Sequence, residues 1–219
     1  MVAGGHILLE GVPGLAKTLA CKTVSDISGL DFKRIQFTPD LLPADLTGTL
    51  IYEQSTGNFK VRKGPIFTNL VLADEINRAP AKVQSALLEA MAENQVTIGE
   101  TTYELPKPFF VLATQNPIEQ EGTYNLPEAE LDRFLMKVMV HYPNAKNEVE
   151  IVKSKIKASE IKVEKVLSES DIKKCQELLD SVVCDDAIIE YIVSIVNVTR
   201  PETGKKAANK SVTKDRDDI

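Results

Sequence analysis

The chain has 219 residues, of which 43% are hydrophobic and 26% are charged, and its formal net charge is −6. These values are typical of a globular protein that buries a core without disulfides, and they exclude a disordered chain, a collagen-like chain and a disulfide-rich miniprotein. The negative charge counts against a nucleic-acid binder that uses its whole surface.

The cysteines and the apolar runs bear on the cellular compartment. Cys21, Cys175 and Cys184 are odd in number and show no C-x-x-C spacing, which indicates free thiols in a reducing compartment. His6 and His141 belong to no ligand cluster, so we expect no zinc site. No run approaches the roughly 20 apolar residues of a membrane span, and the start of the chain does not resemble a signal peptide. We therefore expect a soluble, cytoplasmic protein.

Residues 1–142 alternate short apolar runs with helical segments. The segments Lys17–Ile27 and Ala81–Ala92 have helical patterning, and the runs between them have the length of strands. The runs are Ile7–Leu9, Phe32–Phe37, Leu70–Ala73, Phe109–Ala113 and Leu135–Val140. This alternation predicts an α/β fold with a largely parallel sheet in a first domain, residues 1–142.

Two further segments have the pattern of β-hairpins. Leu50–Val61 contains Ser-Thr-Gly-Asn between β-prone flanks, and Val96–Leu105 turns near Gly99 and Glu100. Hairpins between βα units either act at a surface or only cap the sheet, and the residues alone leave both interpretations open.

The remainder of the chain changes character at Pro143. Helical spacing is found in Ala145–Ile156, Asp171–Val183 and Ala187–Val198, which predicts a partial helical domain over residues 143–200. Ser168 and Asp171 have the spacing of a capping box. Residues 201–219 are polar and lysine-rich, and we expect them to form a disordered tail.

A phosphate-binding loop is the strongest signal in the sequence. An apolar run precedes it and a helical segment follows it, which is the context that such a loop requires. The candidate loop residues are Gly11, Val12, Pro13, Gly14, Leu15, Ala16, Lys17 and Thr18. Backbone N–H groups would hold phosphates, Lys17 would reach the β- and γ-phosphates, and the Thr18 hydroxyl would bind Mg²⁺.

Ala16 departs from the usual pattern, which has glycine at this position. Alanine is small and the position can be helical, so we expect the phosphate cradle to be kept. The alternative is an ordinary glycine-rich turn before a helix.

Two acidic residues follow a buried strand, as the second half of such a site requires. The run Asn69–Ala73 leads into Asp74 and Glu75. Asp74 would hold Mg²⁺ through water, and Glu75 would orient the attacking water. By itself, the pattern also fits a strand that leads into a solvated turn.

Asn116 follows the apolar run Phe109–Ala113. Its amide could bind the γ-phosphate or the water, or it could be a turn residue before Pro117. Local evidence does not separate these alternatives.

Four motifs in order resemble the MoxR family of AAA+ ATPases. They are Gly11-Val-Pro-Gly-Leu-Ala-Lys-Thr18, Ala73-Asp-Glu-Ile-Asn-Arg-Ala-Pro80, Ala113-Thr-Gln-Asn-Pro117 and Leu126-Pro-Glu-Ala-Glu-Leu-Asp-Arg-Phe134. Alanine at the position of Ala16 is normal in that family. The resemblance implies a P-loop NTPase αβα sandwich with a mostly parallel five-stranded sheet and a helical lid.

The resemblance also implies a role for individual residues. Lys17 and Thr18 match Walker A, Asp74 and Glu75 match Walker B, and Asn116 matches sensor 1. Arg133 matches the arginine finger, which stabilises the transition state of a neighbouring subunit and can contribute ~10³-fold or more to the rate. From the local residues alone, Arg133 would instead form a salt bridge with Asp132 or Glu130.

Family membership further implies ATP, Mg²⁺ and partners. The working form is usually a hexameric ring, and the members resemble chaperone-like ATPases that mature other protein complexes, often with von Willebrand A-type domain proteins. The two hairpins resemble insertions that can face the pore and partner proteins in AAA+ rings. ATP hydrolysis with remodelling of protein clients is therefore the leading hypothesis.

Two departures from the family pattern suggest a fragment or truncated product. Relatives have a helical segment before the phosphate-loop strand and a lid motif whose arginine senses the nucleotide, and Thr199-Arg200-Pro-Glu-Thr does not supply that arginine. A nucleotide-binding module without turnover is one alternative. A DNA motor or metal-chelatase subunit is another, although Lys60, Arg62 and Lys63 make only a small basic run.

Overall fold

A computed structural model describes residues 1–12, 14–117, 122–156, 163–179 and 181–200 of the chain. The chain divides into two compact units, one up to residue 180 and one from Ser181 onward, and each is described by itself. The predicted tail, residues 201–219, lies outside the described residues.

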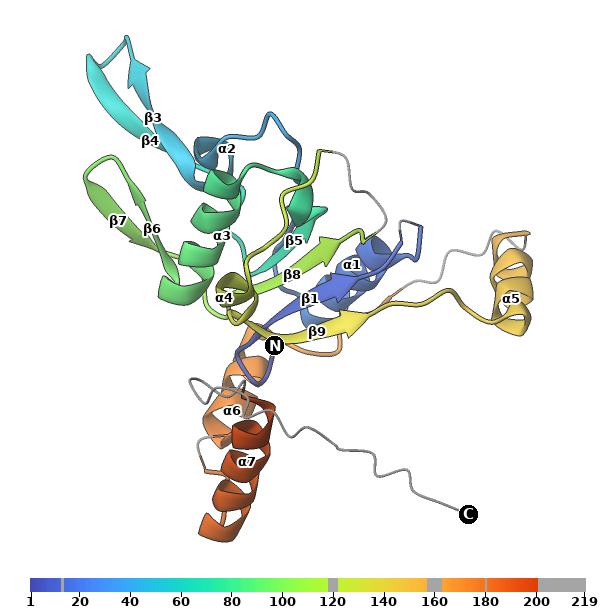
Figure 1. The fold of residues 1–219 in the computed structure, drawn as a ribbon. Helices are drawn as coiled ribbons and strands as arrows, with labels where there is room; N and C mark the ends of the chain where they lie inside the picture. Colours follow the sequence, from blue (N-terminus) through green and yellow to red (C-terminus); the bar gives the residue numbers. More distant parts are fainter. Residues whose placement is uncertain (13, 118–121, 157–162, 180, 201–219) are drawn as a thin grey trace, which may run out of the picture. The chain divides into compact units, whose positions relative to one another are not determined.

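A five-stranded sheet forms the centre of the first unit (Figure 1), and its strands pair in the order β2-β5-β8-β1-β9. All of its pairings are parallel. The strands are β1 (His6–Glu10), β2 (Phe32–Gln36), β5 (Leu70–Asp74), β8 (Phe110–Gln115) and β9 (Phe134–Met139). The predicted α/β fold is thus confirmed, and every predicted strand run belongs to this sheet. Because all strands run in one direction, their carboxyl ends meet at one edge.

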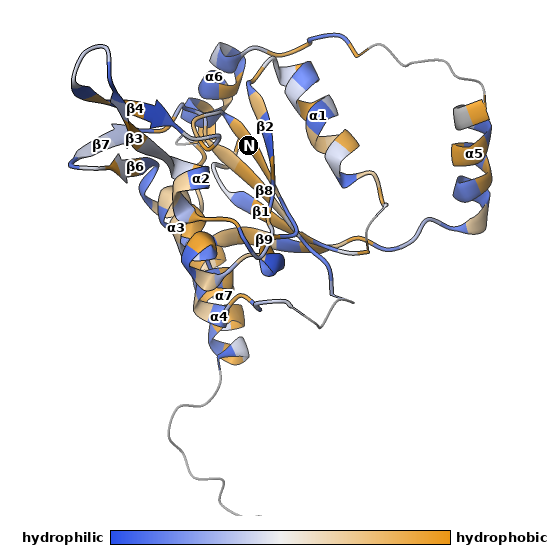
Figure 2. Ribbon diagram, turned by 90° about the horizontal axis from the view of Figure 1, so that it is seen from above, coloured by the Kyte–Doolittle hydropathy of each residue, from blue (hydrophilic) through white to orange (hydrophobic). Residues whose placement is uncertain are grey.

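Helices cover both faces of the sheet, with α1 (Lys17–Ser28) on one side and α3 (Ala81–Glu93) on the other (Figure 2). The central strands need both layers, because Leu70, Val71, Leu72 and Ala73 of β5 are all buried. Phe37 and Leu87 join the same core cluster, of which Val71 is a member. Three short elements were not predicted: α2 (Pro43–Thr47), the 3₁₀ turn η1 (Ile76–Arg78) and α4 (Glu128–Leu131).

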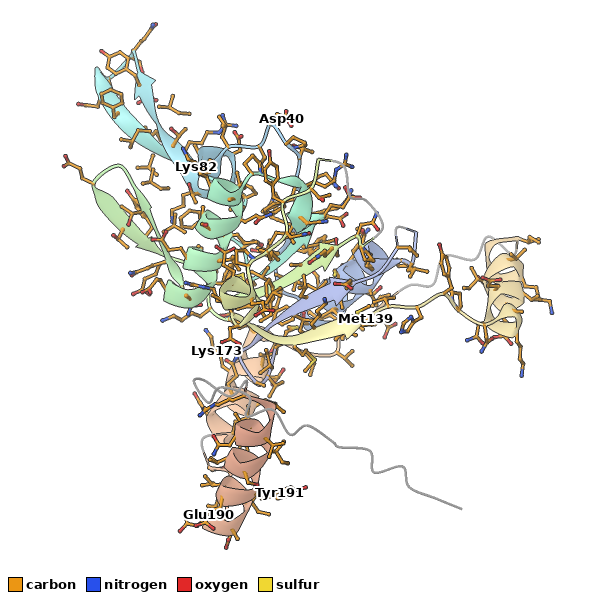
Figure 3. The ribbon with its side chains drawn as sticks, viewed as in Figure 1. Asp40, Lys82, Met139, Lys173, Glu190 and Tyr191 are labelled. Atoms are coloured by element: carbon orange, nitrogen blue, oxygen red, sulfur yellow. The ribbon has the colours of Figure 1, made fainter. Side chains whose placement is uncertain are left out.

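Both predicted hairpins form. The first consists of β3 (Gly48–Glu53) and β4 (Asn58–Lys63), and the second of β6 (Gln95–Ile98) and β7 (Thr101–Glu104). The first hairpin extends away from the central sheet, and its side chains are drawn in Figure 3. Tyr52 and Phe59 pair across it, with ring centroids 5.4 Å apart, and 54% and 69% of their surfaces are exposed.

The predicted helices after Pro143 are present, with one boundary corrected. They are α5 (Ala145–Ile156), α6 (Glu169–Leu179) and, in the second unit, α7 (Asp186–Thr199). The helix expected over Asp171–Val183 is α6, which begins at Glu169 and ends at Leu179. Ser168 N donates to Asp171 Oδ2 (2.9 Å) and Asp171 N donates to Ser168 Oγ (3.3 Å), which is the predicted capping box. None of the described helices has the length and apolar character of a membrane span.

Candidate nucleotide site

The phosphate loop lies between the end of β1 and the start of α1. Gly11 N donates to Gln115 O of β8 (3.1 Å), and Val140 N, just after β9, donates to Glu10 O (2.7 Å). The strand that delivers the loop is therefore held on both sides. Pro13, one of the predicted loop residues, lies outside the described residues.

Lys17 is the first residue of α1, and its side chain bends back over the loop. Its Nζ donates to Gly11 O at 2.8 Å. Burial lowers the pKa of the Lys17 ammonium, while the negative charges of Asp74 and Glu75 act in the opposite direction. The lysine of the loop thus lies within the electrostatic influence of the acidic pair after β5.

Ala16 occupies a conformation that the sequence did not predict. Its φ of 54° and ψ of 24° are left-handed, whereas we expected a residue that could be helical. Left-handed backbone costs a residue with a Cβ more than it costs glycine, which explains why the usual pattern has glycine here. The α1 helix nevertheless begins directly after Ala16, so the loop-to-helix transition is retained.

Asp74 is the last residue of β5, and both of its carboxylate oxygens are engaged. Oδ1 accepts a 2.6 Å hydrogen bond from Thr114 Oγ1 of β8. Oδ2 accepts hydrogen bonds from Arg34 Nε (3.0 Å) and Nη2 (2.6 Å). The carboxylate is mostly buried, and Thr114 is fully buried. Asp74 is therefore fixed in orientation by the two strands that flank β5.

Glu75 follows in a left-handed conformation (φ 57°), so the extended backbone of β5 ends at this residue. Its backbone N–H donates to Thr114 Oγ1 at 2.9 Å. Its Oε2 accepts from Gln36 Nε2 at 3.0 Å and from Arg78 Nη1 at 3.3 Å. The carboxylate is thus held at the carboxyl edge of the sheet.

Arg34, Gln36 and Thr114 are site residues that the sequence analysis missed. Arg34 and Gln36 alternate along β2, and in the parallel register Gln36 lies opposite Asp74. A charged residue and an amide two positions apart in a strand indicate a shared polar face, which was the available signal. What the sequence could not provide was the pairing of β2 with β5.

Asn116 lies at the carboxyl end of β8 and is buried. Its backbone carbonyl accepts a hydrogen bond from Asn77 Nδ2 (3.2 Å) in the η1 turn that follows Glu75. Because β8 lies between β5 and β1 in the sheet, Asn116 is placed between the acidic pair and the phosphate loop.

Arg133 is the predicted site residue that does not join this group. It follows α4 and directly precedes β9, and its Nη1 donates to Leu88 O of α3 at 3.0 Å. Residue Arg133 is exposed. The structure therefore places it away from the other predicted site residues of its own chain.

One cavity of about 1000 Å³ at the carboxyl edge of the sheet joins most of the other predicted site residues, although Gly11 and Val12 are not in its lining. Its lining includes Lys17, Thr18, Arg34, Asp74, Glu75 and Asn116. Met139, labelled in Figure 3, marks the end of β9 near this edge.

The donor set of the cavity fits a magnesium nucleotide. Hydroxyl and carboxylate oxygens such as those of Thr18 and Asp74 are the hard ligands that Mg²⁺ prefers, and Mg²⁺ usually keeps several waters and binds substrate phosphates as well. Lys17 and the amino end of α1 supply positive charge for phosphates.

Comparison with known proteins agrees with this geometry. Residues 6–136 match the family model described as "ATPase family associated with various cellular activities (AAA)". The chain belongs to this AAA family and is of the MoxR type. Its sequence is 50% identical to the chaperone MoxR1 of Mycobacterium tuberculosis over 200 residues, which cover 91% of this chain and 53% of that protein.

Two further relatives have similar coverage. The uncharacterized protein YeaC of Bacillus subtilis is 52% identical over 91% of this chain and 63% of its own length. A crystal structure from Cytophaga hutchinsonii, of a protein assigned as an ATPase, is 55% identical, with a TM-score of 0.82 over 91% of this chain and 61% of that one. This MoxR-type chain thus spans about half to two thirds of the length of these relatives.

Proposed function

We propose that the chain binds ATP with Mg²⁺ and hydrolyses it to ADP and phosphate. The observation that carries the proposal is the single cavity that Lys17, Thr18, Asp74, Glu75 and Asn116 line together. Membership of an ATPase family supports it independently. We also propose that residues 1–142 are the ATPase domain and that residues 143–200 belong to a helical lid.

Each residue of the cavity has a chemical task in this proposal. Lys17 and the loop amides would bind the β- and γ-phosphates, while Thr18 and Asp74 would hold the magnesium ion that neutralises phosphate charge. Glu75 would orient and polarise the attacking water, and Asn116 would position that water or the γ-phosphate. The hydrogen bonds that hold Asp74 and Glu75 in place before substrate arrives support these assignments, because preorganised groups cost less reorganisation during reaction.

Phosphate release by four proteins tests the proposal. Lys17→Ala should lose nucleotide binding, whereas Glu75→Gln should keep binding and lose turnover by about 10²-fold or more. Lys22→Ala, which removes an exposed lysine further along α1, is the matched control and should behave as the wild type. Equal turnover in all four would contradict hydrolysis at this site. Binding without turnover in the wild type would favour a nucleotide-binding module instead.

We further propose that Arg133 acts on the nucleotide of a neighbouring subunit in a hexameric ring. Its exposure and its place outside the cavity of its own chain support this role. Turnover per chain should then rise with protein concentration. A mixture of Lys17→Ala and Arg133→Ala chains should recover activity that neither has alone, because some interfaces would combine an intact site with an intact arginine. Without such recovery, action between subunits would be rejected.

Protein clients are the substrates that we propose for remodelling, with von Willebrand A-type domain proteins as partners. The relative MoxR1 is named a chaperone. The exposed Tyr52 and Phe59 on the first hairpin support client contact, since large exposed aromatic side chains favour protein interfaces. Serine at both positions should weaken binding of a purified A-domain partner, measured by titration calorimetry, and leave ATP binding intact. Tyr191→Ser, at an exposed tyrosine of α7, is the control.

We propose a cytoplasmic location. Cys21, Cys175 and Cys184 are free cysteines, and the last two are exposed. Exposed thiols are compatible with a reducing compartment.

A further inference from the structure

Arg34 binds the carboxylate that is expected to serve the magnesium ion. It lies on β2 at the edge of the sheet, and its guanidinium reaches the end of the neighbouring strand β5. Nε and Nη2 donate to the same oxygen, Oδ2 of Asp74, at 3.0 and 2.6 Å. The Arg34 side chain is 47% exposed, whereas that of Asp74 is only 14% exposed. The more exposed guanidinium therefore lies on the solvent side of a mostly buried carboxylate.

The same guanidinium is connected to the second acidic residue. Arg34 Nη2 also donates to Gln36 Oε1 at 2.7 Å, and Gln36 Nε2 donates to Glu75 Oε2 at 3.0 Å. A continuous chain of hydrogen bonds thus runs from Asp74 through Arg34 and Gln36 to Glu75. Movement of the guanidinium away from Asp74 would break the Arg34–Asp74 hydrogen bonds and also the bond between Arg34 and the Gln36 amide.

Charge explains the pairing of Arg34 with Asp74. Asp74 and Glu75 are consecutive acidic residues that line the same cavity, where repulsion between their charges is screened less than in water. With Thr114 on Oδ1 and Arg34 on Oδ2, Asp74 has charge-assisted hydrogen bonds on both oxygens. The guanidinium thus occupies one of the two oxygens with which Asp74 could receive a hydrated cation from the cavity.

We propose that Arg34 is the resting counter-ion of Asp74 and competes with Mg²⁺ for it, so that this arginine sets the Mg²⁺ concentration at which the nucleotide binds. This inference rests on the proposed nucleotide site. Arg34 is a positioning residue in this scheme: it holds Asp74, and through Gln36 also Glu75, until the metal replaces it. Loading of the metal would then be linked by one side chain to the Gln36–Glu75 hydrogen bond, while Arg78 continues to bind Glu75.

The test measures binding and not turnover. A fluorescent ATP analogue is titrated against the wild type, Arg34→Met, Arg34→Lys and Lys33→Gln, first in EDTA and then over a series of free Mg²⁺ concentrations. Methionine keeps the apolar stem and removes every donor. Lysine keeps the charge and loses the fork of donors. Lys33 is the adjacent residue, whose side chain lies on the other face of the strand, and it controls for loss of a positive charge from β2.

Loss of the competing guanidinium should lower the Mg²⁺ concentration for half-maximal nucleotide binding by about tenfold in Arg34→Met. Arg34→Lys should fall between this variant and the wild type, and Lys33→Gln should match the wild type. In the absence of nucleotide, Mg²⁺ alone should raise the melting temperature of Arg34→Met more than that of the wild type. This second measurement would show that the effect arises at the carboxylate.

Two results would overturn the inference while leaving the proposed function intact. One is an unchanged Mg²⁺ dependence in Arg34→Met. The other is weaker binding of the analogue in EDTA together with a higher Mg²⁺ requirement, which would mean that Arg34 contacts the phosphates. Failure of the wild type to bind the analogue at any Mg²⁺ concentration would overturn both the proposed function and this inference.

Discussion

The hydroxyl of Thr114 donates a 2.6 Å hydrogen bond to Asp74 Oδ1 and accepts one of 2.9 Å from the backbone N–H of Glu75. A single buried side chain on β8 therefore orients both acidic residues at the end of β5. Neither bond involves a residue of the phosphate loop, so the acidic half of the site is held in place by the sheet itself.

Thr114→Val should leave the Glu75 N–H and one Asp74 oxygen without their partner at nearly unchanged volume. We expect a loss of about 1–3 kcal/mol in the free energy of unfolding, measured by urea denaturation. Thr97→Val removes a threonine hydroxyl bonded to Thr102 on an exposed hairpin, and it should change stability by less than about 0.5 kcal/mol. Similar losses in both variants would show that the buried Thr114 hydrogen bonds contribute no more to stability than the exposed Thr97–Thr102 bond does.

Ala16→Gly and Ala20→Gly should change stability in opposite directions. At Ala16 the backbone is left-handed (φ 54°), so glycine should relieve strain and raise the free energy of unfolding by about 1 kcal/mol. Ala20 lies inside α1, where glycine should cost about 1 kcal/mol. Thermal or urea unfolding of both variants checks the sign. Destabilisation by Ala16→Gly would contradict the left-handed assignment.

His6 should make stability depend on pH. Its Nδ1 accepts from Val111 N at 3.0 Å, and its Nε2 lies 3.3 Å from Met91 O. Burial lowers the pKa of His6 from 6.5, while the Met91 carbonyl acts in the opposite direction and the N-terminal charge lowers it further. Because the unfolded state then binds more protons than the folded state, stability falls as the pH is lowered. The contribution of neutral His6 to the free energy of unfolding is fully present above pH 6.5 and is lost as the pH falls through the folded pKa.

The measurement is the urea midpoint between pH 7.5 and pH 5.5 for the wild type and for His6→Asn. Asparagine supplies an oxygen near the place of Nδ1 and has no charge to gain. The wild type should lose more stability over this interval than the variant does. Parallel curves would assign the pH dependence to other groups.

The three cysteines should differ in reactivity. Burial, with a smaller contribution from Asp74, raises the pKa of the Cys21 thiol to about 11, whereas Cys175 and Cys184 are exposed. Since the thiolate is the reactive form, a thiol reagent at pH 8 should modify two cysteines rapidly and the third only on unfolding. The variant Cys21→Ala should lose the slow phase and keep the fast one, which identifies the protected thiol.

The sequence predicted the sheet because its strands are short apolar runs bounded by turn residues. It also predicted the position of Asp74 at a strand end, since parallel strands bring their carboxyl ends together. The left-handed backbone of Ala16 was missed, because alanine carries no sign of this conformation. The contact between Arg34 and Asp74 was missed for a different reason: it depends on the pairing of β2 with β5, which are 40 residues apart at these two positions.

Short elements and helix boundaries were also difficult to predict from the sequence. α4 has only four residues, Glu128–Leu131, too few for a periodic pattern. The C-terminal end of α6 was placed too late, at Val183 instead of Leu179, because apolar residues continue beyond the helix. The predicted start of this helix, Asp171, lies closer to the observed start at Glu169, because the Ser168–Asp171 capping box is a local signal.

Gly11, the first residue of the phosphate-loop motif, also has a packing role that does not involve phosphate. A Cβ at this position would lie 2.6 Å from the carbonyl oxygen of Val140, where the chain leaves β9. A larger residue here would push the chain segment after β9 away from β1, whether or not a nucleotide is bound. The glycine at this position is therefore explained by the close approach of two chain segments. Lys17 is the better marker of phosphate binding.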